Sequence, residues 1–215
     1  MVVWDFTDPK APSHTKPLLT GHITLDIRAI SDNGNVAITT HWESGNIEVL
    51  GVWDLTDKRN PSHTQVTAPG TTHERGPAAI SDDGNVAITT HWESGNNDVL
   101  IIWDLRDPEN PTHIKTDTPH TGSLDAVLMS AEGNAAITID DRGAAALWDL
   151  ANNEPIYTEL STPHNRSVES VAISADGTTA ITTDLFQAAI WDLTDPENPT
   201  HIKTDTPHTL SLIHI

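Results

Sequence analysis

The stretch VLIIWDLRDPENP, from Val99 to Pro111, joins an apolar strand, a Trp-Asp pair and a polar link that contains proline. The pair recurs at intervals of 49, 50, 45 and 43 residues, at Trp4, Trp53, Trp103, Trp148 and Trp191. The surrounding sequence repeats too, because GNVAITTHWESGN fills both 34–46 and 84–96, and DPENPTHIKTDTPHT fills both 107–121 and 195–209. Such a period is typical of repeat architectures, and matches this long indicate recent internal duplication.

Each repeat predicts four short strands. The first strand, as in SVESVAIS at 167–174, ends in a turn of the type SDNG, SDDG, SAEG or SADG. Asp or Asn bonds its own backbone in such a turn, and Gly adopts the positive φ. The second strand is rich in β-branched residues, the third ends in Trp-Asp, and the fourth follows a proline that an edge strand tolerates. Because no segment has a convincing helical period, the sequence predicts an all-β fold with almost no helix.

These units resemble WD repeats, which form β-propeller blades of four antiparallel strands around a central channel. The resemblance covers residues 1 to about 209 and implies a partial blade at 1–22 and blades at about 23–72, 73–119, 120–163 and 164–208. Because the first residues match a third strand, we expect a truncated arc of at least four blades from a larger ring, incomplete or open. Residues 210–215, LSLIHI, break the repeat. They resemble a translated transposase end sequence, so we interpret them as a sequencing artefact, with a genuine first strand as the alternative.

The resemblance also implies a buried polar network. In this family a His before the first strand, a Thr or Ser in the second, an Asp after it and the Trp are linked, which satisfies the indole N–H. The matching residues in two blades are His120, Thr138, Asp140 and Trp148, and His164, Thr182, Asp184 and Trp191. Asp141 competes with Asp140 for its position. In the two earlier blades His41 and His91 replace the Asp, so we expect their networks to be altered or missing.

The composition restricts the kind of partner. A formal net charge of −20 repels phosphate backbones and anionic membranes, so nucleic acid and membrane surfaces are disfavoured as partners. Basic protein partners fit this charge, as does a salty habitat. The chain has no cysteine, no apolar stretch long enough for a membrane helix and no signal peptide at its first residues. We therefore expect a cytoplasmic protein.

The twelve histidines do not predict a metal site. Eleven of them fall at repeat positions, and copies one blade apart are too distant to share one ion. The paired acids Asp82-Asp83 and Asp140-Asp141 match a turn and a network position, and neither has the spacing of a calcium loop. No nucleophile, base and orienter are grouped. We therefore expect no enzyme activity, no metal and no cofactor.

The loops between second and third strands are the candidate partner-binding surface. Two of them are longer and carry Trp42, Glu43, Trp92 and Glu93, and the later blades place Arg142 and Phe186 at matching positions. Tryptophan is enriched at binding hot spots. The alternative is an extended hairpin in which Trp42 and Trp92 pack on cross-strand neighbours such as Val49 and Val99.

Three function classes stay open. The first is a non-catalytic scaffold or sensor module for protein–protein interaction, since bacterial repeats of this type resemble sensor parts of larger signalling proteins. The second is a binder of a small ligand or peptide in the propeller channel or rim. The third is an accessory part of an enzyme. The fold alone does not choose among them.

Overall fold

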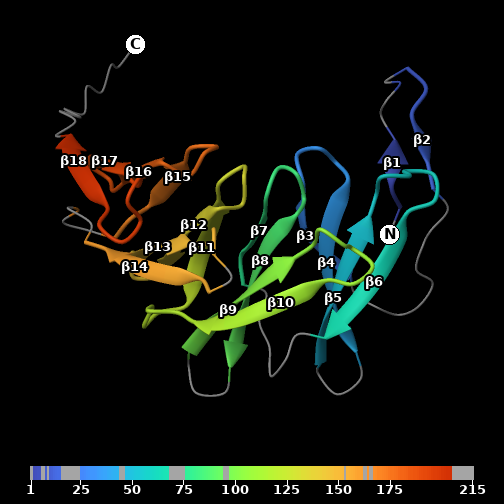
Figure 1. Ribbon diagram of the computed structural model, residues 1–215, viewed down its shortest axis with the longest axis horizontal. Coiled ribbons are helices and arrows are strands. Elements are labelled where there is room, and N and C mark those ends of the chain that lie inside the picture. The colour runs from blue at the N-terminus through green and yellow to red at the C-terminus, as the bar shows by residue number, and fades with distance from the viewer. Residues whose placement is uncertain are drawn as a thin grey trace, which may run out of the picture. The chain divides into compact units, whose positions relative to one another are not determined.

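A computed structural model describes residues 2–5, 8, 10–15, 25–43, 47–67, 76–93, 97–152, 154–161, 164 and 167–204. These residues form antiparallel strands and turns (Figure 1). The described part of the chain contains no helix, and hence none that is long and apolar enough to span a bilayer. The predicted all-β fold is confirmed.

The chain divides into two compact units, Met1–Thr118 and Pro119–Ile215. The first unit starts with a two-stranded sheet of β1 (Trp4–Asp5) and β2 (Ser13–His14). Two four-stranded sheets follow in it: blade 1 is β3 (Leu25–Ile30), β4 (Val36–Glu43), β5 (Ile47–Asp54) and β6 (Ser62–Thr67), and blade 2 is β7 (Ala78–Ile80), β8 (Val86–Glu93), β9 (Asn97–Asp104) and β10 (Thr112–Asp117).

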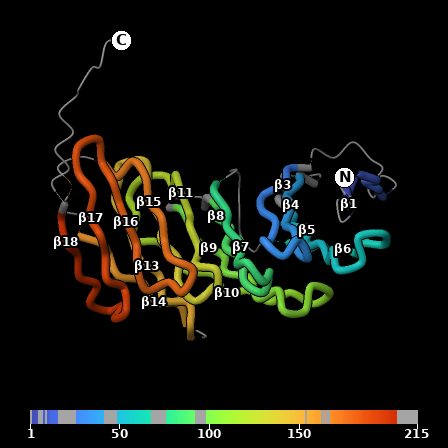
Figure 2. Tube along the Cα trace, turned by 90° about the horizontal axis from the view of Figure 1, so that it is seen from above, coloured from blue at the N-terminus to red at the C-terminus, as the bar shows by residue number. Residues whose placement is uncertain are grey.

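The second unit holds blade 3 and blade 4. Blade 3 is β11 (Leu124–Met129), β12 (Ala135–Asp140), β13 (Ala145–Asp149) and β14 (Ile156–Leu160), and blade 4 is β15 (Ser170–Ile173), β16 (Thr179–Thr183), β17 (Ala188–Asp192) and β18 (Thr200–Thr204). Within every blade the strands pair antiparallel in chain order. Figure 2 shows the same strands as a Cα trace from above. Each predicted four-strand repeat is therefore one sheet.

Local chemistry explains the tight turn between first and second strands. In blade 1, Ser31 Oγ accepts the backbone N–H of Val36 at 3.0 Å, and the Gly34 N–H bonds the Ser31 carbonyl at 2.8 Å. Gly34 has a φ of 68°, which glycine adopts without the steric penalty of a Cβ. Gly84 and Gly177 repeat this conformation in blades 2 and 4.

The Asp of each Trp-Asp pair ends the third strand. Asp54 Oδ1 accepts the Thr56 N–H at 2.8 Å, and Asp192 Oδ1 accepts the Thr194 N–H at 3.0 Å. Such side-chain bonds to the backbone two residues later favour a turn over continued pairing. The hydrogen bonds that Asp192 accepts from the Thr194 hydroxyl and, to a smaller extent, from the Thr194 backbone N–H lower the pKa of Asp192.

The core lies between successive sheets within each unit. Side chains of a strand alternate between two faces, and we name them by the third strand. The leading face carries the Trp of the Trp-Asp pair, and the trailing face carries the residue before it. The trailing face of blade 1, with Ile38 and Val52, forms one buried cluster with the leading face of blade 2, with Trp103. Ile137 and Leu147 of blade 3 form the same kind of cluster with Trp191 of blade 4.

The indoles of the four blades are at most 2% exposed, namely Trp53, Trp103, Trp148 and Trp191. A third trailing-to-leading contact exists at the start of the chain, where Val3 packs against the cluster of Ala37, Trp53 and Leu55. Full burial of one large aromatic side chain contributes roughly 2–3 kcal/mol. Trp53, Trp103 and Trp191 therefore fill the space between successive sheets within their own units.

Candidate interaction surface

The network residues named for blade 3 lie together in its interior. Trp148 Nε1 donates a hydrogen bond of 2.9 Å to Thr138 Oγ1, and His120 Nε2 lies 2.7 Å from the same oxygen. His120 Nδ1 lies 3.7 Å from Asp140 Oδ2, and both side chains are only 1% exposed. Asp141, the competing residue, is exposed. The hydroxyl of Thr138 thus links the indole to the imidazole, and Asp140 is the carboxylate beside it.

Blade 4 repeats this geometry. Trp191 Nε1 donates to Thr182 Oγ1 at 2.9 Å, and His164 Nε2 lies 2.8 Å from that oxygen. His164 Nδ1 lies 3.7 Å from Asp184 Oδ2. Burial lowers the pKa of His164, and it outweighs the opposite effect of the Asp184 carboxylate. The neutral form of His164 is therefore favoured over the charged form.

In blades 1 and 2 the indole still bonds a threonine, but the histidine comes from a different position in the repeat. Trp53 Nε1 donates to Thr39 Oγ1, and Trp103 Nε1 donates to Thr89 Oγ1, both at 2.9 Å. In blade 2, His91 Nε2 lies 2.7 Å from Thr89 Oγ1, so the ring comes from the same strand. The imidazole beside this threonine therefore belongs to His91 of the second strand, whereas in blades 3 and 4 it belongs to a His that precedes the first strand. His22 and His73, which precede the first strands, lie outside the described residues.

In blade 1 the corresponding imidazole, that of His41, lies near a residue of the fourth strand. His41 is buried, and its Nε2 lies 3.4 Å from Gln65 Nε2 on β6. Thr39 Oγ1 instead lies 3.5 Å from the Gly51 carbonyl oxygen, at the outer limit of a hydrogen bond. The indole–threonine bond is therefore the constant part of the motif, and its imidazole partner differs from blade to blade.

The two buried carboxylates have a second role, because they shape the loops after the second strands. Asp140 Oδ1 accepts the N–H of Arg142 at 3.0 Å and of Ala144 at 2.8 Å. Asp184 Oδ1 accepts the N–H of Phe186 and of Gln187, both at 2.7 Å. Each carboxylate thus ends its strand and holds a tight loop. The network inside the blade and the loop on its rim share one side chain.

Two residues of the predicted partner-binding surface whose side chains are described, Arg142 and Phe186, lie on these loops. Leu185 is 53% exposed and Phe186 is 52% exposed, so two large apolar side chains stand side by side in sequence on the blade 4 loop. Arg142 is exposed on the blade 3 loop, and its Nη1 donates to Thr121 Oγ1 at 3.1 Å. The rim of this unit therefore combines an apolar pair and a cation on loops with fixed backbones.

The blade 3 loop rests on the segment that enters blade 4. Ser167 Oγ donates to the Arg142 carbonyl at 3.0 Å. Gly143 has a φ of 79°, and a Cβ built there would lie 2.3 Å from Ser167 Cα and 2.4 Å from Val168 N. Only glycine fits this close backbone approach. The approach fixes the base of the Arg142 loop against its neighbour.

The corresponding loops of blades 1 and 2 are extended hairpins. Where Asp would end the strand, His41 pairs with Val49, and the ladder continues through Trp42–Glu48 and Glu43–Ile47. Blade 2 has the same register, in which His91 pairs with Val99 and Trp92 with Asp98. The alternative in which Trp42 and Trp92 pack on Val49 and Val99 does not match this register, because these valines lie opposite His41 and His91. The side chains of Trp42, Glu43, Trp92 and Glu93 lie outside the described part of the chain.

One repeated contact escaped the sequence interpretation. Each Trp of a Trp-Asp pair lies opposite an aromatic residue of the fourth strand, and Trp53 stacks on His63 with ring centroids 4.5 Å apart at 17°. The pairs Trp103–His113 and Trp191–His201 are tilted, with centroids at 4.9 and 4.7 Å. In blade 3, Tyr157 replaces the His at 5.2 Å. The constant Trp-to-His interval of ten residues was the available signal.

No group of three or more His, Asp or Glu side chains among the described residues could hold a metal ion. The histidines of the fourth strands pack on the indole rings of the Trp-Asp pairs. Among the described histidines, His91, His120 and His164 lie in the networks, and His63, His113 and His201 lie on the Trp rings.

Comparison with known proteins bears on the fold alone. No protein-family profile matches the chain, and no curated protein matches its sequence. Among solved structures, the crystal structure of TolB from Acinetobacter baumannii matches with a TM-score of 0.51 and 17% sequence identity, over 93% of this chain and 48% of that one. TolB is a β-propeller. The chain therefore has a β-propeller fold and spans about half the length of the TolB structure that it matches.

Proposed function

We propose that this chain is a WD-repeat propeller segment that serves as a non-catalytic protein-interaction scaffold or sensor module of a larger signalling protein. Five Trp-Asp pairs at blade spacing support the assignment to WD repeats. The His–Thr–Trp linkage with a neighbouring Asp in blades 3 and 4 supports it independently.

The observation that carries the interaction role is the loop after β16. Leu185 and Phe186 are about half exposed, although their backbone is held by bonds to Asp184. An apolar pair on a backbone that is already ordered loses little conformational entropy on binding. Large aromatic anchors also dominate interface energetics. Arg142 on the neighbouring loop adds a cation that can bond a partner's carboxylate or carbonyl oxygen.

The charge of the whole chain suits a particular partner surface. A net charge of −20 accelerates association with basic proteins and opposes association with nucleic acid or anionic membranes. The partner we propose is a protein that offers an apolar pocket for Phe186, surrounded by basic residues. A cytoplasmic location remains part of this proposal.

A displayed peptide library tests the proposal, because it samples many partner sequences at once. Peptides selected on the wild-type chain should bind the Phe186→Ser variant at least about tenfold more weakly, the effect of losing one hot-spot side chain. The matched control is Ile156→Ser, an apolar residue of the same unit that is 50% exposed on β14. Control and wild type should bind alike. Selected peptides that bind Phe186→Ser and the wild type equally would refute this location of the surface.

A further inference from the structure

The turns between the first and second strands of blades 1 and 2 lie directly against each other. Asn33 in the blade 1 turn donates its backbone N–H to the Asp82 carbonyl at 3.1 Å, and its Nδ2 donates to the Asp83 carbonyl at 2.9 Å. The packing is equally close, because a Cβ built on Gly84 would lie 2.8 Å from Val36 Cγ2. We call this the turn contact of blades 1 and 2. Asn33 supplies both of these hydrogen bonds, so the contact depends on it.

Blades 3 and 4 form an equivalent contact in the second unit. Asn134 Nδ2 donates to the Asp176 carbonyl at 3.2 Å, and a Cβ built on Gly177 would lie 2.8 Å from Ala135 Cβ. A side-chain amide on the earlier blade therefore joins the two turns in each unit. The two amides differ in the residue that follows them, because glycine follows Asn33 whereas Ala135 follows Asn134.

An asparagine followed by glycine carries the reacting groups of deamidation on neighbouring atoms. The backbone nitrogen of Gly34 attacks Asn33 Cγ and gives up its proton, the Cγ–Nδ2 bond breaks, and the side-chain nitrogen leaves as ammonia with that proton. Glycine favours this attack because it has no Cβ to obstruct it. Water then opens either C–N bond of the resulting cyclic imide, which leaves aspartate or isoaspartate without any oxidation or reduction. Water reaches this position, because it is exposed in blades 1, 2 and 4.

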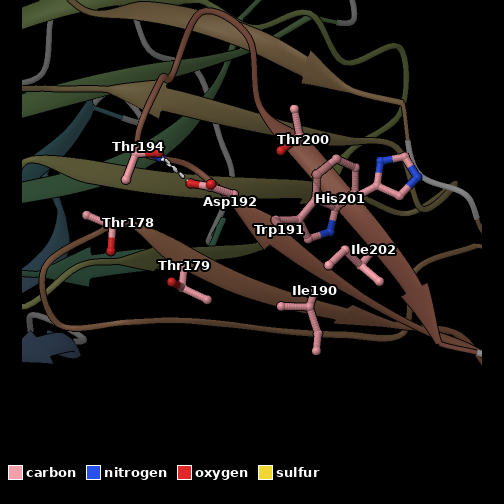
Figure 3. A pocket seen from close by; sticks show the side chains of 9 residues that line it. All are labelled: Thr178, Thr179, Ile190, Trp191, Asp192, Thr194, Thr200, His201 and Ile202. Atoms are coloured by element: carbon pink, nitrogen blue, oxygen red, sulfur yellow. Dashed lines mark hydrogen bonds between the residues drawn. The ribbon is translucent and has the colours of Figure 1, made fainter.

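The equivalent turns of the other three blades are less suited to this reaction. Blades 2 and 4 carry Asp before the glycine, and an ionised carboxylate resists attack by a nucleophile. In blade 4 the hydrogen bond from the Ser174 hydroxyl, followed by bonds from Thr178, lowers the pKa of Asp176 and keeps it ionised. Figure 3 labels Thr178 among the residues that line a depression on this blade. Blade 3 carries Glu132, whose longer side chain would have to close a larger ring. Asn33 is therefore the reactive residue of the four, and it belongs to the one Asn-Gly pair in the chain.

The folded turn holds every group that would have to react. The attacking nitrogen is engaged, because the Gly34 N–H donates to the Ser31 carbonyl at 2.8 Å. The side-chain carbonyl is engaged too, because Asn33 Oδ1 accepts the Ser31 hydroxyl and the Asn35 N–H, both at 2.8 Å. The leaving nitrogen, Nδ2, donates across the turn contact to Asp83. The attack therefore requires the turn to open, and local opening of a hydrogen-bonded segment is a minor population.

We propose that Asn33 is a site of spontaneous deamidation, that the closed turn contact protects it, and that its product weakens the contact. An aspartate at this position is compatible with the turn itself, since Asp83 in blade 2 accepts the Ser81 hydroxyl at 2.7 Å and the Asn85 N–H at 2.9 Å. A carboxylate cannot donate to the Asp83 carbonyl, and its charge would lie beside that oxygen. Isoaspartate also adds a carbon to the backbone and so displaces Gly34. Both products therefore loosen the pairing of blades 1 and 2.

Deamidation of the folded and the unfolded chain tests the protection. The protein is incubated in mildly alkaline buffer with or without guanidinium chloride and digested with pepsin in acid, and the masses of the peptides are followed with time. We expect Asn33 to convert at least about tenfold more slowly in the folded chain. Asn134 is the matched control, because it makes the same bond between turns but precedes Ala135, and it should keep its amide in both samples. Equal rates for Asn33 in the two samples would overturn the proposal.

Opening the turn contact from the blade 2 side separates local protection from global stability. Gly84→Ala directs a Cβ at Val36 from a residue with a φ of 79°. Gly177→Ala makes the equivalent change in blade 4, where the φ is 75°. Gly84→Ala should speed the conversion of Asn33 by about threefold or more, and Gly177→Ala should leave it unchanged. Equal effects of the two substitutions, or no effect of Gly84→Ala, would contradict protection by this contact.

The variant Asn33→Asp reproduces one product and tests its effect directly. Amide hydrogen exchange in the turn peptides of blades 1 and 2 should be about threefold faster or more than in the wild type, because the bond to the Asp83 carbonyl is lost. The turn peptides of blades 3 and 4 serve as the reference within the same molecule and should not change. This measurement decides the effect of the product even if Gly84→Ala does not fold. Wild-type exchange in the turns of blades 1 and 2 would show that the product does not weaken the contact.

Discussion

Replacing Thr138 with valine removes the oxygen that joins two buried groups while preserving the shape of the side chain. Thr138 Oγ1 accepts the Trp148 indole N–H and contacts His120 Nε2. Trp148 is 0% exposed and His120 is 7% exposed, so water cannot replace the hydroxyl without rearrangement. Leaving one buried polar group without a partner costs about 1–3 kcal/mol. With two such groups, and less than full additivity, we expect Thr138→Val to lower the free energy of unfolding by about 2–5 kcal/mol.

The chain contains its own comparison for this variant. Thr39 in blade 1 accepts the Trp53 indole N–H, and its nearest other polar contact is the Gly51 carbonyl at 3.5 Å. Thr39→Val should therefore cost only the single-group amount, about 1–3 kcal/mol. Thr138→Ser keeps the hydroxyl and loses one methyl group, which is worth about 1 kcal/mol. The expected order of destabilisation is Thr138→Val first, with Thr39→Val and Thr138→Ser below it.

Hydrogen exchange followed by mass spectrometry is the suitable assay, since it reports protection for β12–β13 and for β4–β5 separately. That separation matters because the chain consists of two compact units that need not unfold together. If Thr138→Ser destabilises β12–β13 as much as Thr138→Val does, methyl packing and not the hydroxyl holds the site. A loss below about 0.5 kcal/mol for Thr138→Val, the range of ordinary surface changes, would equally refute the role of the network.

Three further outcomes follow from the same geometry. Gly143→Ala should destabilise the second unit by more than the roughly 1–2 kcal/mol of a left-handed alanine, because its Cβ meets backbone at 2.3 Å, whereas Gly34→Ala meets nothing within 4 Å and should show that penalty alone in urea unfolding. Asp184→Ala should speed amide exchange at Phe186 and Gln187, whose N–H groups lose their acceptor, and Asp184→Asn should largely preserve protection. Burial lowers the pKa of His164 below 6.5, so the unfolded chain binds more protons at this side chain than the folded chain does. The stability that neutral His164 contributes is therefore complete above pH 6.5 and is lost as the pH falls through the folded-state pKa. An NMR titration of His164 with a midpoint at or above 6.5 would contradict this.

The periodic features of the fold were predictable because they are encoded locally. The turn SDNG and the Trp-Asp pair each fix a backbone conformation within a few residues, as the bonds of Ser31 and Asp54 show. Strand pairing then follows from the order of short β segments joined by tight turns. The four-stranded sheets of the all-β fold could therefore be inferred from the repeated sequence alone.

The site details depended on distances that the sequence does not express. His91 and His120 both reach a threonine hydroxyl, yet one lies two residues from its partner and the other lies 18 residues away. Spacing alone could not choose between these routes. The cross-strand partners in the long hairpins could not be read from the sequence for a related reason, since only the three-dimensional ladder shows that Val49 lies opposite His41. The exposure of Ile190 was equally hidden, because its sequence context matches that of the buried Leu147.

The carboxylate under each tight loop has a practical consequence for protein engineering. Asp184 satisfies the backbone at the base of its loop, while the apolar clusters that hold the sheets together lie on the strands. Residues beyond that base can be exchanged or lengthened without altering the clusters, and blades 1 and 2 already carry extended strands at the equivalent place. A foreign peptide epitope grafted between Leu185 and Phe186 should therefore be displayed in a constrained form on an otherwise unchanged sheet.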